Sequence, residues 1–254
     1  MSGFAPDFAG AEVRVSPNFG PRRDVTRPDI VILHYTGMAS AEAAEAWLCD
    51  PSSEVSAHYL VHEDGRIVQM VREADRAWHA GKGSWHGHTD INSRSIGVEI
   101  ANPGAEGGFP DFADIQIDAV IRLIRDITAR CGILAERVLA HSDVAPGRKI
   151  DPGAKFPWRR LFEAGVGHLA VPERDCAVPP SAAGDQGRHV EQLQSMLQLY
   201  GYGVEISGFF DPATKAAVEA FQLHFRPACA DGAADKETLA TLYALLASLP
   251  GGTG

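Results

Sequence analysis

The sequence has no long apolar run and little positive charge, and each absence excludes a class of function. No stretch approaches the roughly 18 apolar residues of a membrane-spanning helix, so we expect no membrane span. The formal net charge is −10 at pH 7. This charge argues against nucleic acid as a partner, because proteins that bind it present a basic face. Nothing in the sequence predicts an oligomer, so a monomer is the default.

The first residues also lack the features of an export signal. They carry no early positive charge and no continuous apolar stretch, and no cysteine stands near the start to take a lipid anchor. The four cysteines, Cys49, Cys131, Cys176 and Cys229, form no C-x-x-C pair. We expect plain thiols, which are typical of a reducing compartment. These absences predict a cytoplasmic location, and the alternative is the periplasm or cell envelope, reached by an unrecognised route.

What is present is an ordinary globular composition, divided by one linker-like segment. Of the 254 residues, 45% are hydrophobic and 22% are charged, which is typical of globular domains. The stretch between residues 165 and 188 is rich in Gly, Pro and Ala and shows no helical or strand period. We therefore expect a large domain at 1–168, a linker at 169–184 and a small domain at 185–250.

The large part mixes strand and helix signals, which predicts a mixed β-sheet flanked by helices, an α/β (α+β) fold. Its clearest helix spaces isoleucine and valine three and four residues apart and is followed by Gly132, a typical C-cap. Asp64-Gly65 predicts a hairpin turn between two apolar runs. The expected strands are 29–34, 57–62, 66–70, 95–100 and 138–141, and the expected helices are 40–48 and 115–131.

The small part contains a repeat that predicts how two of its helices begin. Residues 208–214 and 232–238 share the pattern G-x-x-D-x-x-T, in which the aspartate suits the N-cap position. With an earlier helix that stops near Gly201, the pattern predicts a three-helix bundle. This part shows no catalytic cluster of His, Cys or carboxylate residues. We therefore expect a binding or packing module, and as an independent domain tethered to the large one it should contribute binding alone.

Three residues of the large part have the composition of a catalytic metal site. His34 and His141 each stand at the end of an apolar strand, before loop-forming residues. Asp151 follows His141 by ten residues in a segment rich in Pro and Gly. Two imidazoles and one carboxylate are a ligand set of catalytic zinc, with a fourth position open to water. A lone histidine on a strand is more often an ordinary packed residue, so spacing alone leaves both interpretations open.

Five motifs follow one another across about residues 14–168: 31–36 (VILHYT), 56–61 (SAHYLV), 77–81 (AWHAG), 95–100 (SIGVEI) and 140–153 (AHSDVAPGRKIDPG). In order and spacing they resemble the zinc N-acetylmuramoyl-L-alanine amidases, in particular the AmiD/AmpD branch, whose fold is that of the peptidoglycan recognition proteins and of phage T7-type lysozyme. The C-terminal part contains the pairs 193–194 (LQ) and 221–222 (FQ), the triplet 200–202 (YGY) and the G-x-x-D-x-x-T pattern at 208–214. Through these residues it resembles the three-helix peptidoglycan-binding module.

The resemblance implies one zinc per chain, held by His34, His141 and Asp151, with Glu99 and Lys149 as catalytic residues. The chemistry agrees with these roles. A carboxylate such as Glu99 can take a proton from water and deliver it to the departing alanine nitrogen. The ammonium of Lys149 can stabilise a developing oxyanion. The implied reaction is hydrolysis of the bond between N-acetylmuramic acid and L-alanine, during turnover or recycling of the bacterial cell wall.

Four further residues are expected to line the substrate-binding cleft. His79 belongs to a motif that lines the cleft in the resembled family, and we expect it to be a wall of the cleft or a support for a metal ligand. Trp78 has an aromatic face that suits a sugar, although aromatic residues are more often part of a core. The full set of expected substrate-binding residues is Trp78, His79, Asn102 and Arg148.

Two questions of function stay open on the sequence. The substrate is either small anhydromuropeptides, which the missing export signal favours, or polymeric peptidoglycan, which the C-terminal module favours. The main alternative to an enzyme is a non-catalytic peptidoglycan-binding or recognition protein. An inhibitor of RNA polymerase, known for a phage relative, is disfavoured by the C-terminal module. The complete set of candidate ligands with Glu99 and Lys149 favours the enzyme.

Overall fold

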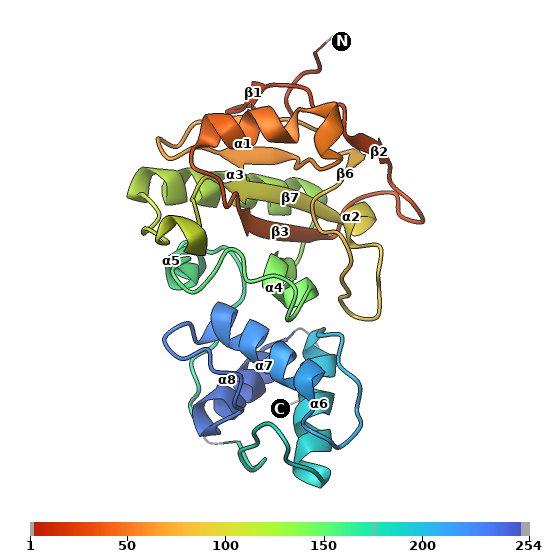
Figure 1. The fold of residues 1–254 in the computed structure, drawn as a ribbon, viewed down its shortest axis with the longest axis vertical. Coiled ribbons are helices and arrows are strands. Elements are labelled where there is room, and N and C mark those ends of the chain that lie inside the picture. Colours follow the sequence, from red (N-terminus) through yellow and green to blue (C-terminus); the bar gives the residue numbers. More distant parts are fainter. Residues whose placement is uncertain (1–2, 175, 250–254) are drawn as a thin grey trace.

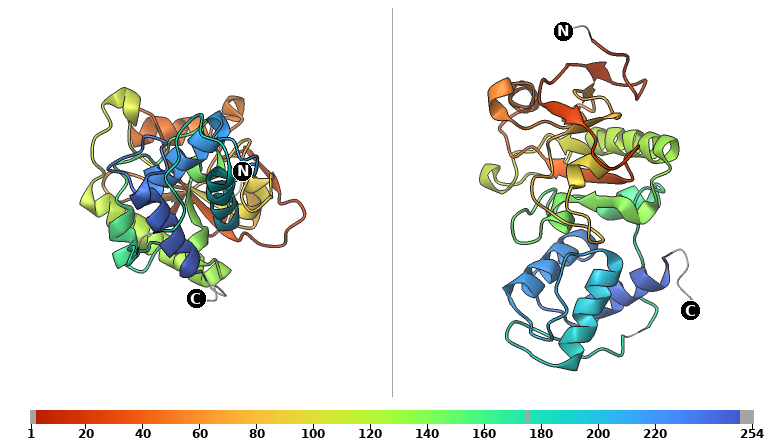
Figure 2. Two further views of the ribbon diagram at one scale, coloured as in Figure 1. Left: turned by 90° about the horizontal axis from the view of Figure 1, so that it is seen from below. Right: turned by 90° about the vertical axis from the view of Figure 1, so that its right-hand side faces the viewer.

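A computed structural model describes residues 3–174 and 176–249, and it arranges them in two stacked parts (Figure 1). The upper part is a sheet between helices, and the lower part is a group of helices beneath α4 and α5. The turned views in Figure 2 show the same stacking. The helices are α1 Ala41–Leu48, α2 Ile91–Arg94, α3 Asp114–Cys131, α4 His141–Val144, α5 Trp158–Glu163, α6 Arg188–Tyr200, α7 Pro212–Phe225 and α8 Lys236–Ala247.

The sheet is mixed, with strand order β1-β5-β4-β7-β3-β8. The strands β4, β7, β3 and β8 run parallel to their neighbours in that order, and β5 is antiparallel to β4. A separate antiparallel ribbon joins β2 and β6. The strands are β1 Glu12–Val13, β2 Phe19–Pro21, β3 Ile30–Tyr35, β4 Tyr59–Val61, β5 Ile67–Gln69, β6 Asp75–Ala77, β7 Ser95–Ile100 and β8 Val138–Ala140.

Alternation along the central strands divides their side chains between two hydrophobic cores. Val31 and Leu33 of β3 point to the face covered by α3, whose apolar stripe packs against them. Ile30 and Ile32 point to the opposite face and belong to another cluster. Because side chains alternate along a strand, His34 must share the face of Ile30 and Ile32. The site therefore develops on the face away from α3.

The expected elements of the large part are present, with small differences at their ends. The hairpin forms between β4 and β5, and the helix predicted at 115–131 is α3, Asp114–Cys131, which ends at the C-cap Gly132 with its positive φ of 68°. One expectation needs correction: His141 is not the last residue of a strand. It is the first residue of α4, because the Asp143 carboxylate accepts the Ala140 N–H and turns the chain into a helix at that point.

The predicted repeat of the C-terminal part is visible in its contacts. Asp211 and Asp235 are the N-caps of α7 and α8, and each accepts the backbone N–H of the threonine three residues later. A buried glutamine serves each repeat. Gln194 bonds the Gly208 N–H and the first threonine, and Gln222 does the same for Gly232 and the second. Each glutamine thus joins a loop to the start of a helix.

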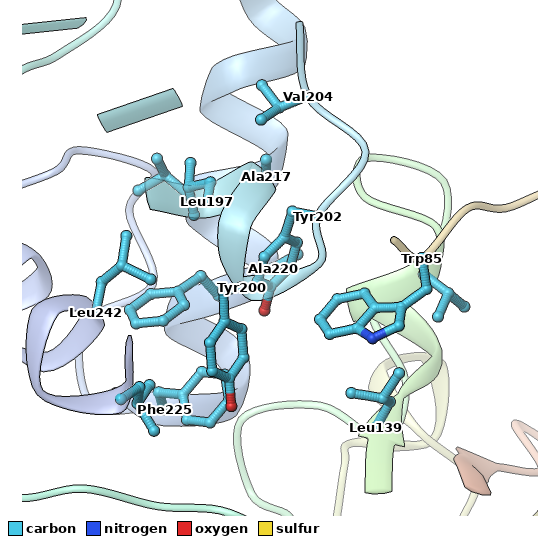
Figure 3. Packing of buried hydrophobic residues seen from close by; sticks show 14 of the residues in the cluster. Trp85, Leu139, Leu197, Tyr200, Tyr202, Val204, Ala217, Ala220, Phe225 and Leu242 are labelled. Carbon is cyan, nitrogen blue, oxygen red and sulfur yellow. The ribbon is translucent and has the colours of Figure 1, made fainter. Parts of the chain in front are cut away.

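The two parts share one continuous hydrophobic cluster, which the sequence did not predict. Trp85 and Leu139 of the upper part belong to the same buried cluster as Tyr202 and Phe225 of the lower part (Figure 3). The segment between α5 and α6 forms isolated bridges with the lower part, such as Ser181 with Ala234. The C-terminal part is therefore packed against the sheet domain as well as tethered to it. The division into domains at 168/169 and 184/185 stays a prediction.

Two expectations from composition can be compared with the described residues. No helix within residues 3–174 or 176–249 combines the length and apolar character needed to cross a bilayer. All four cysteines lie in these ranges, and none of them is in a disulfide.

Candidate active site

The three candidate metal ligands converge at the carboxyl end of the sheet. His34 is near the end of β3, His141 opens α4, and Asp151 lies in the loop after α4. The Nδ1 atoms of the two histidines are 2.9 Å apart, and each lies within 3.0 Å of Asp151 Oδ2. All three residues are buried. The Ser142 N–H donates to the Asp151 carbonyl, which brings the loop back to the start of α4.

Hydrogen bonds from the far side of each ring decide which nitrogen faces the cluster. His141 Nε2 lies 3.0 Å from the Ala80 carbonyl, which only an N–H can contact favourably, so its Nδ1 carries a lone pair. His34 Nε2 faces His79 Nδ1 at 3.0 Å, and His79 Nε2 faces Ser95 Oγ. Since Ser95 Oγ donates to a carbonyl, it accepts from His79. His79 therefore accepts from His34, whose Nδ1 is also a bare lone pair.

This arrangement fits a divalent cation. Two imidazole lone pairs and a carboxylate oxygen lie within 3.0 Å of one another in a buried place, where they repel each other unless a cation lies among them. Burial and the facing His141 lower the pKa of His34 to about 4. Two histidines and one carboxylate are a donor set that zinc accepts.

Glu99 is placed beside this cluster by strand register. It pairs directly with His34 across the parallel strands β7 and β3, so both side chains point to the same face. Its Oε2 atom is buried and has no hydrogen-bond partner within the described residues. Burial, followed by the nearby Asp151 carboxylate, raises the pKa of Glu99 well above its usual range. A carboxylate in this condition is suited to accept and release a proton.

A glycine in the same strand makes room for the support of His34. Gly97 lies two residues before Glu99 on the same face, and a Cβ atom there would stand 2.4 Å from the ring of His79. Only glycine lets this ring approach the sheet closely enough to reach His34 Nε2. Strand β7 therefore contributes to one site the Glu99 carboxylate, the Ser95 hydroxyl and, at Gly97, the room that the His79 ring occupies.

The cluster opens into a cleft of about 610 Å³. Its walls come from α1, from the segment around Trp78 and from the loop that carries Lys149. Lys149 is exposed, and it lines the cleft together with Glu99. A volume in this range suits a small-molecule substrate with several polar groups. The cleft thus combines proton-transfer, cationic and aromatic groups around the metal cluster.

The four expected substrate-binding residues are placed differently from one another. Trp78, His79 and Arg148 line the cleft. His79 also holds His34, and Arg148 donates to the carbonyls of Ala80 and Lys82, so each has a structural contact. The fourth, Asn102, is buried and is not among the cleft-lining residues.

The side chain of Asn102 serves the loop that follows β7. Its Nδ2 donates to the Pro110 carbonyl, and its Oδ1 accepts the Gly104 N–H. The Asn102 carbonyl also accepts from the Thr36 hydroxyl. These contacts fix the chain after the strand and leave the substrate role of Asn102 a prediction.

An aromatic residue of the cleft wall, Trp47, was missed by sequence reasoning. Trp47 of α1 lines the cleft, and its side chain is 48% exposed. The buried positions of α1 include Ala41, Ala44 and Leu48, so Trp47 lies off the buried stripe of its helix. A large aromatic residue on the polar side of a short helix is the signal that would have identified it.

Comparison with known proteins relates both parts of the chain to described families. A family model described as N-acetylmuramoyl-L-alanine amidase matches residues 24–154, and one for a peptidoglycan binding domain matches residues 186–242. The N-acetylmuramoyl-L-alanine amidase AmiD of Escherichia coli (strain K12) is 38% identical over 232 residues, which are 87% of this chain and 83% of that protein. The 1,6-anhydro-N-acetylmuramyl-L-alanine amidase AmpD of the same strain is 32% identical over 61% of this chain and 91% of its own.

Solved structures give the same relation. The complex of E. coli AmiD with the substrate anhydro-N-acetylmuramic acid-L-Ala-D-gamma-Glu-L-Lys has a TM-score of 0.74 and 34% identity, and covers 95% of this chain and 94% of that one. AmpDh3 of Pseudomonas aeruginosa in complex with anhydromuramic pentapeptide has a TM-score of 0.70 and 32% identity, over 91% of this chain and 94% of that one.

Proposed function

The chain belongs to the N-acetylmuramoyl-L-alanine amidase family, and we propose which of its residues hydrolyse the amide bond between N-acetylmuramic acid and L-alanine. The observation that carries the proposal is the pairing of His34 with Glu99 in register. This pairing sets a metal ligand beside a buried carboxylate oxygen that has no hydrogen-bond partner among residues 3–174 and 176–249. The substrate of the enzyme is derived from peptidoglycan.

His34, His141 and Asp151 hold one zinc ion per chain. Their converging lone pairs and the ring tautomers imposed by Ala80 and His79 support this assignment. When bound, zinc supplies Lewis acidity, which activates water and polarises the amide carbonyl. The protein residues then hold the reacting groups and move the proton.

Glu99 is the general base and then the general acid. Its Oε2 accepts a proton from the attacking water as the bond from water oxygen to the carbonyl carbon forms. The same atom returns the proton to the alanine nitrogen as the carbon–nitrogen bond breaks. The raised pKa of Glu99 supports this cycle, because a carboxylate with a higher pKa is a stronger base.

Lys149 stabilises the negative charge that develops on the carbonyl oxygen. It lies in the same loop as Asp151 and lines the same cleft as Glu99. Its side chain is exposed and lines the cleft, so its ammonium group can approach the carbonyl oxygen of a bound substrate. Its backbone N–H donates to the Ala145 carbonyl, which holds the loop in a turn.

The substrate that the cleft suits best is a muramoyl peptide of small size. Two similar proteins have been solved with anhydromuramoyl peptides, and the cleft volume of about 610 Å³ suits one sugar with the first residues of its stem. Trp47 and Trp78 offer aromatic faces to the sugar ring. We propose 1,6-anhydromuramoyl peptides as the preferred substrate, with polymeric peptidoglycan as the alternative that the C-terminal module favours.

Metal content and turnover together test this proposal. The purified chain should hold about one zinc ion. His34→Ala should lose most of this zinc and should no longer release the stem peptide from anhydromuramoyl-tripeptide. His88→Ala is the matched control, because His88 is exposed and outside the cleft. Full zinc content in His34→Ala would remove the site. A zinc-loaded wild type that binds the muropeptide without cleaving it would favour the recognition-protein alternative.

A further inference from the structure

The helix α4 is the place where the metal cluster and the C-terminal module meet. His141 begins the helix and contributes a candidate ligand, while the module helix α7 packs directly against α4. Figure 1 shows α4 between the sheet and α7. With four residues, α4 is a single turn, which is too short to be stable through its own hydrogen bonds. Its position must therefore depend on what surrounds it.

One carboxylate of α4 collects the polar contacts. Asp143 is fully buried, and its Oδ2 accepts the Ala140 N–H at 2.8 Å from its own segment. Tyr202 donates its hydroxyl to Oδ1 at 2.6 Å, and His224 Nδ1 lies 2.7 Å from Oδ2. Tyr202 and His224 both belong to the C-terminal module and are buried. Two of the three hydrogen bonds of Asp143 thus come from the module.

Apolar contacts exclude water from this polar group. The ring of His224 stacks on Trp158 of α5, with centroids 3.7 Å apart. On the other side, Trp85 packs edge-on to Tyr202 at 5.0 Å, and Gly201 is so close to Trp85 that a Cβ would stand 2.4 Å from the indole. Figure 3 shows Trp85 on one side of the interface and Tyr202 on the other.

The same helix of the module also contacts the loop that leads to the remaining ligand. A Cβ at Gly147 would stand 3.1 Å from the Cβ of Ala216 in α7. Gly147 lies between α4 and Asp151, in the loop that carries Lys149. The module therefore touches both chain segments that deliver His141 and Asp151 to the cluster.

A buried carboxylate that loses its donors carries a large desolvation cost, so the segment around it rearranges to find new partners or water. Asp143 lies two residues after His141 in the single turn of α4, so the two residues move together. A shift of Asp143 therefore moves the imidazole of His141. Groups that hold metal ligands in place commonly change metal affinity or activity by 10- to 100-fold when they are altered.

We propose that the C-terminal module is part of the catalytic scaffold, and that Asp143, held by Tyr202 and His224, is a positioning residue for His141. The module then does more than bring the enzyme to its substrate. It fixes the metal cluster even when the substrate is small and soluble. This inference rests on the proposed metal ligand His141 and adds to it a dependence on contacts from the other part of the chain.

Two tyrosines of the module provide a matched test in the full-length, zinc-loaded protein. Tyr202→Phe removes only the hydroxyl that donates a hydrogen bond to Asp143. Tyr200→Phe removes a buried hydroxyl of the same module that contacts His168 Nδ1 at 2.8 Å, away from α4. We expect Tyr202→Phe to lose zinc to a colorimetric chelator roughly tenfold faster than wild type and to lower kcat with little change in KM. Tyr200→Phe should keep the wild-type rate of zinc loss and the wild-type kcat.

Substitutions at His224 separate the hydrogen bond from packing. His224→Asn keeps a donor near the position of Nδ1 but loses the ring that stacks on Trp158, whereas His224→Phe keeps a ring and loses the donor. We expect His224→Asn to have the lower Tm, but His224→Phe to lose zinc faster. An interface that acts through packing alone would give His224→Asn both the lower Tm and the faster zinc loss.

The outcomes distinguish this inference from the proposed function. A wild-type protein without zinc would overturn the metal site itself. A zinc-loaded wild type with the same rate of zinc loss in Tyr202→Phe and Tyr200→Phe would leave the metal site intact and overturn the role of Asp143. A lower Tm in His224→Asn together with faster zinc loss in His224→Phe would support the positioning role.

Discussion

At the scale of single residues, the site depends on which atom each histidine turns toward the cluster. His34 and His141 both present Nδ1, because their Nε2 atoms donate to His79 and to the Ala80 carbonyl. These partners lie 45 and 61 positions away along the chain. The sequence identifies the histidines as candidate ligands, but only their distant partners decide the ring orientation.

The proton-transfer role of Glu99 is testable without disturbing its shape. Glu99→Gln keeps the size of the side chain and removes the proton acceptor, so kcat should fall by roughly 10²- to 10⁴-fold, the usual contribution of a general acid–base group. Zinc content should be unchanged, because Glu99 is outside the ligand cluster. Steady-state kinetics on a soluble muropeptide and metal analysis measure both effects.

A surface glutamate provides the control for this substitution. Glu106 is exposed in a short turn, and Glu106→Gln should leave kcat at the wild-type value. A Glu99→Gln variant with near wild-type turnover would mean that another group moves the proton.

At the scale of elements, strand register makes two distant residues neighbours. The apolar runs that form β3 and β7 are evident in the sequence, and the ends of both were predicted within one residue. The pairing of His34 with Glu99 could not be predicted from these runs, because a shift of one residue in strand register would turn either side chain to the opposite face. The contact of Gly97 with the ring of His79 opposes that shift, because a residue with a Cβ at that place would clash with the ring.

The helix starts of the C-terminal module allow a quantitative test of the repeat. Asp211 accepts the Thr214 N–H at 2.7 Å and caps α7. Asp211→Ala should lower the free energy of unfolding by about 1 kcal/mol, the typical contribution of an N-cap. Chemical denaturation with a fluorescence or circular dichroism signal measures this change.

An acidic residue of the same module controls for charge. Glu205 is exposed and lies outside the helices, so Glu205→Ala should change stability by less than about 0.5 kcal/mol. Equal losses in the Asp211 and Glu205 variants would show that the cap contributes nothing beyond net charge.

At the scale of the whole molecule, the shared core changes what removal of the module should do. A chain that ends at Val171 would expose apolar side chains such as Trp85 and Leu139, and it would leave Asp143 without two donors. We expect a lower Tm, faster zinc loss and a fall of roughly tenfold or more in kcat on a soluble muropeptide. Calorimetry, chelator competition and kinetics measure the three effects.

A lengthened linker is the matched control for this truncation. About ten Gly and Ser residues inserted after Val171 keep the module present and allow it to dock, so kcat on the soluble muropeptide should stay near wild type. The contrary result would be a truncated chain with wild-type Tm and soluble activity that fails only on insoluble wall sacculi. The module would then act as a tether alone, as the sequence suggested.

The sequence by itself determined the family, the mixed sheet, the three C-terminal helices and the candidate ligands His34, His141 and Asp151. These depend on local signals, such as apolar periodicity, capping residues and motifs, which are complete within short stretches of chain. Only the tertiary structure decided the tautomers, the exposure of Trp47 in the cleft and the contact of Tyr202 and His224 with Asp143. Each of these joins residues that are far apart in the chain, and burial makes their polar contacts obligatory. A linker rich in Gly and Pro looks the same whether the domain behind it is free or docked, because docking depends on complementary surfaces that periodicity does not reveal.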